Sequence, residues 1–285
     1  MADVPNIFDR KAVLQRKRRA ARMTGDKILA TEAGKALAHR LATVNRTFEE
    51  PVALDVPAAV LGYFEGIAGE WTFATIGESE ALALEHEHFD LVVSILSLHA
   101  VNDLPGVMLQ IRHALKPDGL FMAALFGGDT LHELRESFAA GESDVLGGVS
   151  PRVAPFADVR DMGGLLQRAG FALPVADVER TTIRYREFST LVGDLRAAGE
   201  TNALAQRQRK PLRRDVFGSA LSHYARHHAE GDGRLRATFD IIYLTGWAPH
   251  ESQQQPLKPG PARVRLANAL GTVERSAGDI ARPKR

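Results

Sequence analysis

Residues 89–126, FDLVVSILSLHAVNDLPGVMLQIRHALKPDGLFMAALF, contain the pattern that decides the fold. Phe89–Leu96 is a nearly continuous apolar run, typical of a strand that is buried on both faces of a parallel sheet. Asp103 then precedes apolar residues at helical spacing, and Pro117-Asp118-Gly119 ends that helix before a second apolar run at Leu120–Phe126. Such a strand–helix–strand unit predicts an α/β protein with a mostly parallel sheet.

The same alternation extends to both sides of this unit. Upstream we expect strands at Val52–Val56 and Trp71–Ile76, followed by a short helix at Glu78–Glu85. Downstream, Thr130 and Glu133 fit a capping box that starts another helix. The later strand candidates are Phe171–Val178, Thr181–Arg186 and Leu235–Trp247.

Composition limits the classes of protein to which the chain can belong. Of the 285 residues, 45% are hydrophobic and 25% are charged, which is the balance of a globular protein. There is no cysteine, so disulfides, thiolate metal sites and a cysteine nucleophile are excluded. The longest apolar stretch, near Leu91–Val101, is shorter than the roughly 20 residues that span a bilayer. We expect no membrane span and a cytoplasmic protein.

The chain divides into three parts by composition. Residues 1–48 are predicted to form a basic helical arm, residues 49–249 the main domain with helical insertions, and residues 250–285 a mobile polar tail. The arm has two interpretations. It is either a solvated charged helix on the domain edge or a docking arm for an acidic partner.

Several motifs together resemble one known family. The 89–126 segment continues into GGDTLHELRESF, and the chain also contains IFDRKAVLQRKRRAAR, VSPRVAPFADVRDMGGLLQRAGF, LVGDLRAAGETNAL and GWAPHESQ. This set resembles the class I S-adenosylmethionine-dependent methyltransferases. Within them it is most similar to the branch of complex I assembly factors that act as protein-arginine hydroxylases. The malonyl-carrier-protein methyltransferases of biotin synthesis are more distant.

The resemblance implies a Rossmann-like, mostly parallel sheet with its last strand antiparallel. It also implies S-adenosylmethionine as the cofactor and a protein substrate or client, namely a respiratory complex I subunit. Open α/β sheets bind ligands beyond the carboxyl ends of their strands, which agrees with the place where the family binds its cofactor.

The first cofactor loop departs from the family. Residues 52–66 read VALDVPAAVLGYFEG, and Asp55 keeps the acidic position. The family's three glycines are replaced by Pro57, Ala59 and Leu61. Glycine permits unusual dihedral angles and close backbone approach, whereas proline fixes φ and lacks an N–H donor. The loop therefore predicts a reduced pocket in which the cofactor cannot bind in the usual way.

The spacing after this loop is also short. Between Asp55 and Asp90 there is room for one strand rather than two, so we expect a sheet shortened by about one strand. Glu78 takes the place of the acidic loop that contacts adenine in relatives, or it is only a solvated turn residue. The candidate cofactor-binding residues are Asp55, Glu78, Ser94 and Leu96.

Polar residues follow the central strand where the family places its reacting groups. His99, Asn102 and Asp103 are therefore the catalytic candidates. Each also has a structural interpretation: Asp103 caps the next helix, Asn102 shapes the loop and His99 is a satisfied buried histidine.

Candidate substrate-binding residues are Asp129, Arg135 and Arg152, because arginines recognise carboxylates and acidic peptide faces. The competing interpretation is a structural set of salt bridges. A basic cluster at residues 207–214 has no interleaved aromatics, so we do not expect nucleic-acid binding. His223 and His227 have i, i+4 spacing without the glutamate of the metalloprotease motif, and no metal site is predicted.

Two functions follow from these observations. The first is a methyltransferase-superfamily protein that acts on a protein substrate in complex I assembly, by methyl transfer or by arginine hydroxylation. The second is a cofactor-free binding protein, an assembly chaperone on a degenerate methyltransferase frame. The first cofactor loop discriminates between them, because methyl transfer depends on alignment of the donor.

Overall fold

The strands form a single mixed sheet. The computed structural model describes residues 6–24 and 27–254, and all the elements named below belong to one compact unit. The sheet has six strands in the order β2-β1-β3-β4-β6-β5, and only β6 runs antiparallel to its neighbours. This confirms the predicted fold class, including the antiparallel last strand and the missing strand. The strands are β1 (Pro51–Leu54), β2 (Thr72–Ala74), β3 (Phe89–Ile95), β4 (Leu115–Gly127), β5 (Ala172–Tyr185) and β6 (Leu235–Trp247).

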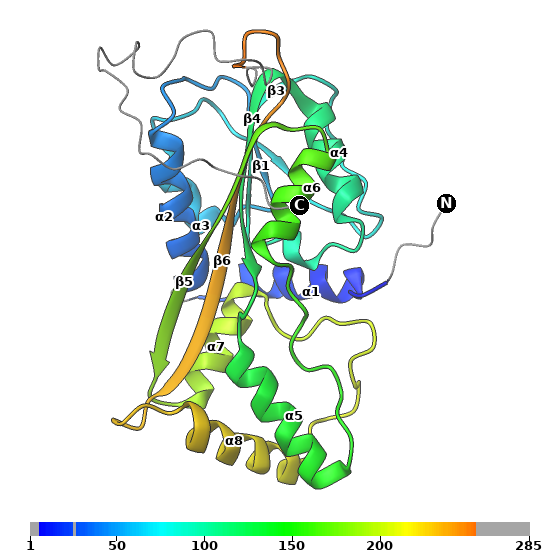
Figure 1. Ribbon diagram of the computed structural model, residues 1–285, viewed down its shortest axis with the longest axis vertical. Helices are drawn as coiled ribbons and strands as arrows, with labels where there is room; N and C mark the ends of the chain where they lie inside the picture. The colour runs from blue at the N-terminus through cyan, green and yellow to red at the C-terminus, as the bar shows by residue number, and fades with distance from the viewer. Residues whose placement is uncertain (1–5, 25–26, 255–285) are drawn as a thin grey trace, which may run out of the picture. The chain divides into compact units, whose positions relative to one another are not determined.

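Helices cover both faces of the sheet (Figure 1). α2 and α3 lie on one face, and α4 and α6 lie on the other. Two short 3-10 turns occupy Gly62–Phe64 and Leu98–Ala100. The helices are α1 (Arg10–Ala21), α2 (Ile28–Ala42), α3 (Ala58–Leu61), α4 (Leu104–Ala114), α5 (His132–Leu146), α6 (Val159–Arg168), α7 (Phe188–Ala198) and α8 (Arg214–His228).

β3 shows why the central strand is apolar on both sides. Leu91, Val93 and Ile95 belong to the core beneath α2, whereas Val92 belongs to the core beneath α4 and α6. All seven residues of the strand are buried. Alternate side chains point to opposite faces of a sheet, so a strand that is covered on both faces cannot carry a polar stripe.

The hairpin of β5 and β6 extends beyond the rest of the sheet. β6 pairs with β4 only as far as Asp240, but it continues to pair with β5 down to Leu235. α5, α7 and α8 gather around this extension, beyond the carboxyl ends of β3 and β4 (Figure 1). α5 and α8 pack so closely that a Cβ on Gly141 would lie 2.6 Å from the Ala220 nitrogen. α5, α7 and α8 thus form a helical layer that faces the strand ends.

The predicted short helix at Glu78–Glu85 is wrong, because this segment forms turns and irregular backbone. Glu80 has φ 58° and a buried side chain that accepts the amides of Asn102 and Asp103 at 2.8 and 2.7 Å. The Leu82 amide donates to Gln110 Oε1 at 2.8 Å. Hydrogen bonds to the next strand–helix connection therefore replace helical hydrogen bonds.

Two other local predictions also need correction. The capping box is wrong, since the Glu133 carboxylate binds the amide and hydroxyl of Thr238 rather than a helix end. The Thr130 hydroxyl donates to Gly127 O. The two predicted strands at 171–186 are a single strand, β5, because β6 continues beside it through the polar residues between them.

α1 is tied to the strand ends by buried polar contacts. Arg10 forms an ion pair with Glu80 at 3.1 Å and donates to Ala100 O and Ile76 O. Asn102 Oδ1 accepts the amides of Ile7 and Phe8. Residues predicted as an N-terminal arm thus belong to the same compact unit as the sheet. In Figure 1, α1 lies across the strand ends, between the sheet and the helical layer.

Within the described ranges, no helix is both long enough and apolar enough to cross a bilayer. The predicted tail at residues 250–285 lies almost wholly outside the described residues.

Replacing Glu80 with alanine should lower the free energy of unfolding by about 3–5 kcal/mol, because it leaves Arg10 buried without its partner. Glu80→Gln should cost less, since an amide oxygen can still accept hydrogen bonds. Denaturant unfolding measures both. The control is Glu78→Ala, an exposed acid two residues away, which should change stability by less than about 0.5 kcal/mol. Equal losses in the Glu80 and Glu78 variants would contradict this role.

Candidate active site

Two strands end in the same unusual way at the carboxyl edge of the sheet. Asp55 follows β1 with φ 54°, and Leu96 follows β3 with φ 49°. Left-handed backbone is rare for residues other than glycine, and it concentrates at functional sites. Both residues turn the chain away from the sheet, which opens a crevice between the strand ends and α1.

This crevice holds a cavity of about 480 Å³, which we call the strand-end cavity. It is bounded by α1, the start of α2 and the ends of β1, β2 and β3. Its volume is within the range of small-molecule and cofactor sites. The side chains that matter for chemistry are Lys17, Arg18, Lys27, Asp55, Phe73 and Thr75.

Asp55 and Lys17 set the electrostatics of the strand-end cavity. Burial raises the pKa of the Asp55 carboxyl above its ordinary value of 3.8, and Lys17 and the Ile76 amide only partly offset that effect. The Ile76 amide donates to Asp55 Oδ2 at 3.4 Å. Lys17 Nζ donates to Leu96 O at 2.7 Å. The cavity therefore combines one acid with several cations, as a zwitterionic ligand requires.

The loop without glycines does not close this cavity. Pro57 caps α3 with φ −63°, an angle that proline favours. Val56, Pro57 and Ala58 line the cavity, whereas Ala59 and Leu61 do not. Leu61, which replaces one of the family's glycines, lies at the end of α3 and does not line this cavity.

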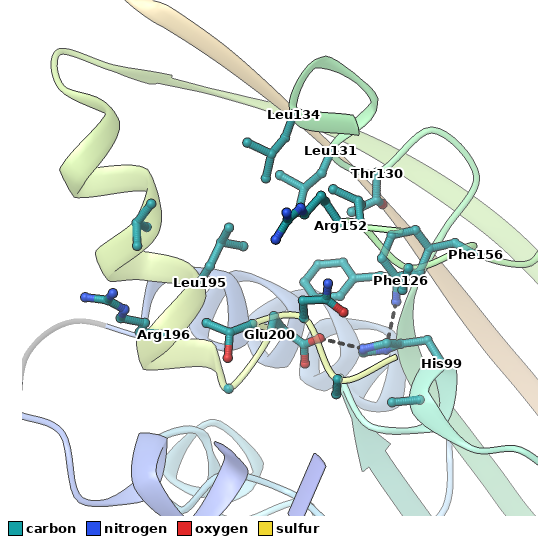
Figure 2. Close-up of a pocket in the computed structure, with 18 of the residues that line it drawn as sticks. His99, Phe126, Thr130, Leu131, Leu134, Arg152, Phe156, Leu195, Arg196 and Glu200 are labelled. Carbon is teal, nitrogen blue, oxygen red and sulfur yellow. Dashed lines mark hydrogen bonds and ion pairs between the residues drawn. The ribbon is translucent and has the colours of Figure 1, made fainter. Parts of the chain in front are cut away.

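A second cavity of about 340 Å³, the aromatic pocket, lies between the strand ends and the helical layer. Figure 2 shows His99, Phe126 and Phe156 on one side and Leu131, Leu134 and Leu195 facing them. The rings of His99 and Phe126 are 5.0 Å apart, and those of His99 and Phe156 are 5.9 Å apart.

His99 and Glu200 form the polar pair of the aromatic pocket. His99 Nε2 lies 2.9 Å from Glu200 Oε2, and the Phe126 amide donates to His99 Nδ1 at 3.4 Å. Because an ionised carboxylate can only accept hydrogen bonds, His99 Nε2 is the donor to Glu200. Burial alone would raise the pKa of Glu200, but His99 and Lys17 outweigh burial and lower it. Glu200 is therefore ionised at neutral pH.

Lys17 lines both cavities. Its ammonium group acts on Asp55 on one side and on Glu200 on the other. The strand-end cavity and the aromatic pocket thus meet at one side chain, which α1 supplies.

The structure brings together two of the four predicted cofactor-binding residues. Asp55 and Leu96 line the strand-end cavity. Ser94 is fully buried in β3 and bonds Ser97 Oγ at 3.0 Å. Glu78 is exposed in a different surface groove, beside Arg10 and Asn102.

Of the three catalytic candidates, His99 lines the aromatic pocket. Asn102 binds the Ile7–Phe8 backbone, and Asp103 caps α4 by accepting the Gly106 amide at 3.0 Å. Asn102 and Asp103 therefore make structural contacts of the kind named above as the alternative to a catalytic role.

Two of the three substrate candidates, Arg135 and Arg152, share one groove, and Asp129 does not line it. Arg152 lines the aromatic pocket and an adjoining open groove, and Arg135 lines only that groove. Arg135 donates to Thr130 O and Ala154 O. Asp129 is paired with Arg180 at 2.7 Å.

The histidines of α8 cluster with His132, the rings of His223 and His227 lying 4.4 Å apart. Within the described ranges, no group of three or more histidines and acids could hold a metal ion.

Sequence reasoning missed Lys17, Phe73 and Glu200. Lys17 looked like one of many cations in a basic helix, and Phe73 looked like an ordinary strand residue. Glu200 lies 101 residues from His99, and no motif connects the two. The left-handed glycine at position 199, which ends α7, is the one local signal near Glu200.

Known proteins match nearly the whole chain. Residues 20–174, more than half of the chain, match the family described as a methyltransferase domain. The human protein named "Arginine-hydroxylase NDUFAF5, mitochondrial" is 38% identical over 94% of this chain and 84% of its own length. A malonyl-[acyl-carrier protein] O-methyltransferase from Laribacter hongkongensis is 38% identical over 64% of this chain and 58% of its own length. Among solved structures, the YcgJ protein of Bacillus subtilis is 11% identical, with a TM-score of 0.48, and the match covers 77% of this chain and 99% of that one.

Asp55→Asn should make the protein more stable than the wild type at neutral pH. The folded-state pKa of Asp55 is raised, so the stability that its protonated form contributes is complete below pH 3.8 and is lost as the pH rises through the folded pKa. The advantage of the variant should therefore shrink as the pH falls to about 3.8. Unfolding measurements across this range test the sign. An advantage that grows on acidification would contradict it.

Proposed function

Because the chain belongs to the methyltransferase-domain family and is 38% identical to a human protein named as an arginine hydroxylase, we propose that it binds S-adenosylmethionine in the strand-end cavity and acts on an arginine side chain in the aromatic pocket. The observation that carries this proposal is the meeting of the two cavities at Lys17. A transferase must hold a donor and an acceptor in adjacent sites with the reacting atoms aligned.

The residues of the strand-end cavity fit the chemistry of this cofactor. Asp55 can accept hydrogen bonds from the ammonium group, and Lys17 or Lys27 can pair with the carboxylate. Phe73 is 65% exposed at the cavity wall, unusual for phenylalanine, and offers a face on which an adenine can stack. The Thr75 hydroxyl can bond a ribose oxygen.

For methyl transfer the cofactor, when bound, would supply an electrophilic methyl group, whereas hydroxylation of arginine would leave that group in place. The contribution of the protein is to position the acceptor and to exclude water. Phe126, Phe156 and Leu134 surround the acceptor site with apolar surface, and the His99–Glu200 pair provides its polar end. A low-dielectric, preorganised site of this kind strengthens every electrostatic contact within it.

The names of the arginine hydroxylases support oxidation of arginine rather than methyl transfer. Hydroxylation places one oxygen atom of dioxygen on the substrate and the other in water, so it consumes two electrons and two protons from an external reductant. The protein residues needed to bind arginine are the same for either reaction.

We infer that the substrate is a subunit of respiratory complex I. This rests on the resemblance of the sequence motifs to the complex I assembly factors, and the human relative is 38% identical over 94% of this chain. Those relatives are named as mitochondrial, so the protein would act where the complex I of its own cell is assembled, rather than in the cytoplasm that we expected.

The alternative, a cofactor-free assembly chaperone, rested on the loop without glycines. It is not favoured, because that loop leaves a cavity of about 480 Å³ with a suitable set of polar groups.

The purified protein should bind S-adenosylmethionine and S-adenosylhomocysteine one-to-one in calorimetry, with dissociation constants in the micromolar range. Phe73→Ala should weaken binding roughly tenfold through loss of stacking. Glu78→Gln, in the separate groove, is the control and should leave affinity unchanged. Absence of heat with the wild type would contradict the cofactor site.

Incubation with complex I subunits, the cofactor, dioxygen and a reductant should add the mass of one oxygen atom to an arginine. Tandem mass spectrometry locates the change. A gain of one methylene group instead would show methyl transfer, and modification of a residue other than arginine would contradict the proposed substrate.

A further inference from the structure

The position of Glu200 is fixed by the end of α7. Gly199 has φ 79°, its amide donates to Arg196 O, and the Glu200 amide donates to Leu195 O at 2.8 Å. This double hydrogen bond is the Schellman arrangement that ends many helices. It holds the Glu200 backbone rigidly, and the side chain enters the aromatic pocket, where it meets His99 (Figure 2).

The two oxygens of the Glu200 carboxylate are not equivalent. Oε2 accepts from His99 Nε2, whereas Oε1 is inaccessible to solvent and has no hydrogen-bond partner among the described residues. A buried carboxylate oxygen without a donor is costly, and in native proteins such a group is explained by strain, by a catalytic role or by a bound water, ion or ligand.

Neighbouring groups do not supply the missing donor. His99 Nε2 already bonds Oε2, and its Nδ1 accepts the Phe126 amide. Lys17 Nζ donates to Leu96 O. The carboxylate therefore keeps an unsatisfied acceptor in an apolar setting.

The two arginines at the aromatic pocket are directed elsewhere. Arg152 pairs with Glu142 and donates to Gln208 at 2.8 Å. The guanidinium of Arg196 points away from His99 and Glu200 (Figure 2). Neither of these cations donates to Glu200 Oε1.

The rest of the aromatic pocket suits a cation with a long apolar stem. Leu134 and Leu195 can pack against methylene groups, and the rings of Phe126 and Phe156 lie 6.2 Å apart near the polar end. A planar guanidinium stacks on aromatic rings and donates in its own plane, which a lysine ammonium cannot do as well.

We propose that Glu200 selects arginine as the substrate, with Oε1 accepting an N–H of the substrate guanidinium while His99 holds Oε2. This deepens the proposed function and rests on it, because it takes the aromatic pocket as the acceptor site. Glu200 is thus a specificity residue, and His99 positions it.

The test compares two probes of equal length that differ in charge and in hydrogen-bonding groups: Nα-acetyl-arginine N-methylamide and its citrulline counterpart, in which a neutral ureido group replaces the guanidinium. Binding to the full chain is followed by chemical-shift titration. The wild type should prefer the arginine probe by roughly tenfold to a hundredfold, as expected for a charge-assisted hydrogen bond. Glu200→Gln should reduce this preference to less than about threefold.

Glu187→Gln is the matched control, since Glu187 is an exposed acid that precedes α7 and bonds Ser189. It should keep the wild-type preference. Retention of the preference in Glu200→Gln would overturn the proposal, as would equal binding of both probes, or no binding of either, by the wild type.

S-adenosylhomocysteine titration of the same samples separates this proposal from the proposed function. Cofactor binding without an arginine preference overturns the role of Glu200 and leaves the cofactor site supported. An arginine preference that Glu200→Gln abolishes, in a protein that binds no cofactor, supports Glu200 and overturns the cofactor site.

Discussion

The site depends on the place where the ladder between β3 and β4 stops. The Leu96 amide still donates to Ala124 O, but the left-handed turn at Leu96 ends the pairing there. The Leu96 carbonyl and the Phe126 amide must then find other partners, because buried backbone groups rarely remain unpaired. Lys17 satisfies the first and His99 the second. One break in strand pairing therefore positions two side chains. They are Lys17, which lies between the two cavities, and His99, which holds Glu200.

The same requirement explains why α1 belongs to the site. Lys17 reaches Leu96 only because the start of its helix is fixed across the strand ends by Arg10 and by the Asn102 contacts. Arg10 is buried and paired with Glu80, so breaking this ion pair would lower the free energy of unfolding. A basic helix that resembles a solvated arm thus forms the wall shared by both cavities. The cations that looked suited to a partner surface include two, Arg10 and Lys17, that face inward.

Much of the fold could be predicted from local pattern. Three predicted elements form as expected: the strand in the apolar run at residues 89–96, the helix after Asp103 and the long strand at 235–247. Each has a pattern of apolar residues that can be recognised within the segment itself. The helix predicted at residues 78–85 does not form, because the Glu80 carboxylate binds amides more than 20 residues away in the sequence. Resemblance indicated Asp55 and Leu96, but their approach to Lys17 depends on how α1 crosses the sheet.

Glu200 could not be found from sequence for the same reason. Its pairing with His99 joins the end of α7 to the loop after β3, two segments that only the folded chain brings together. The most direct test of the account is a crystal structure with S-adenosylhomocysteine. The account predicts the adenine on Phe73, the amino acid moiety near Asp55 and Lys17, and the sulfur facing the aromatic pocket. Ligand bound elsewhere, or with its sulfur turned away from His99 and Glu200, would contradict a two-cavity active site.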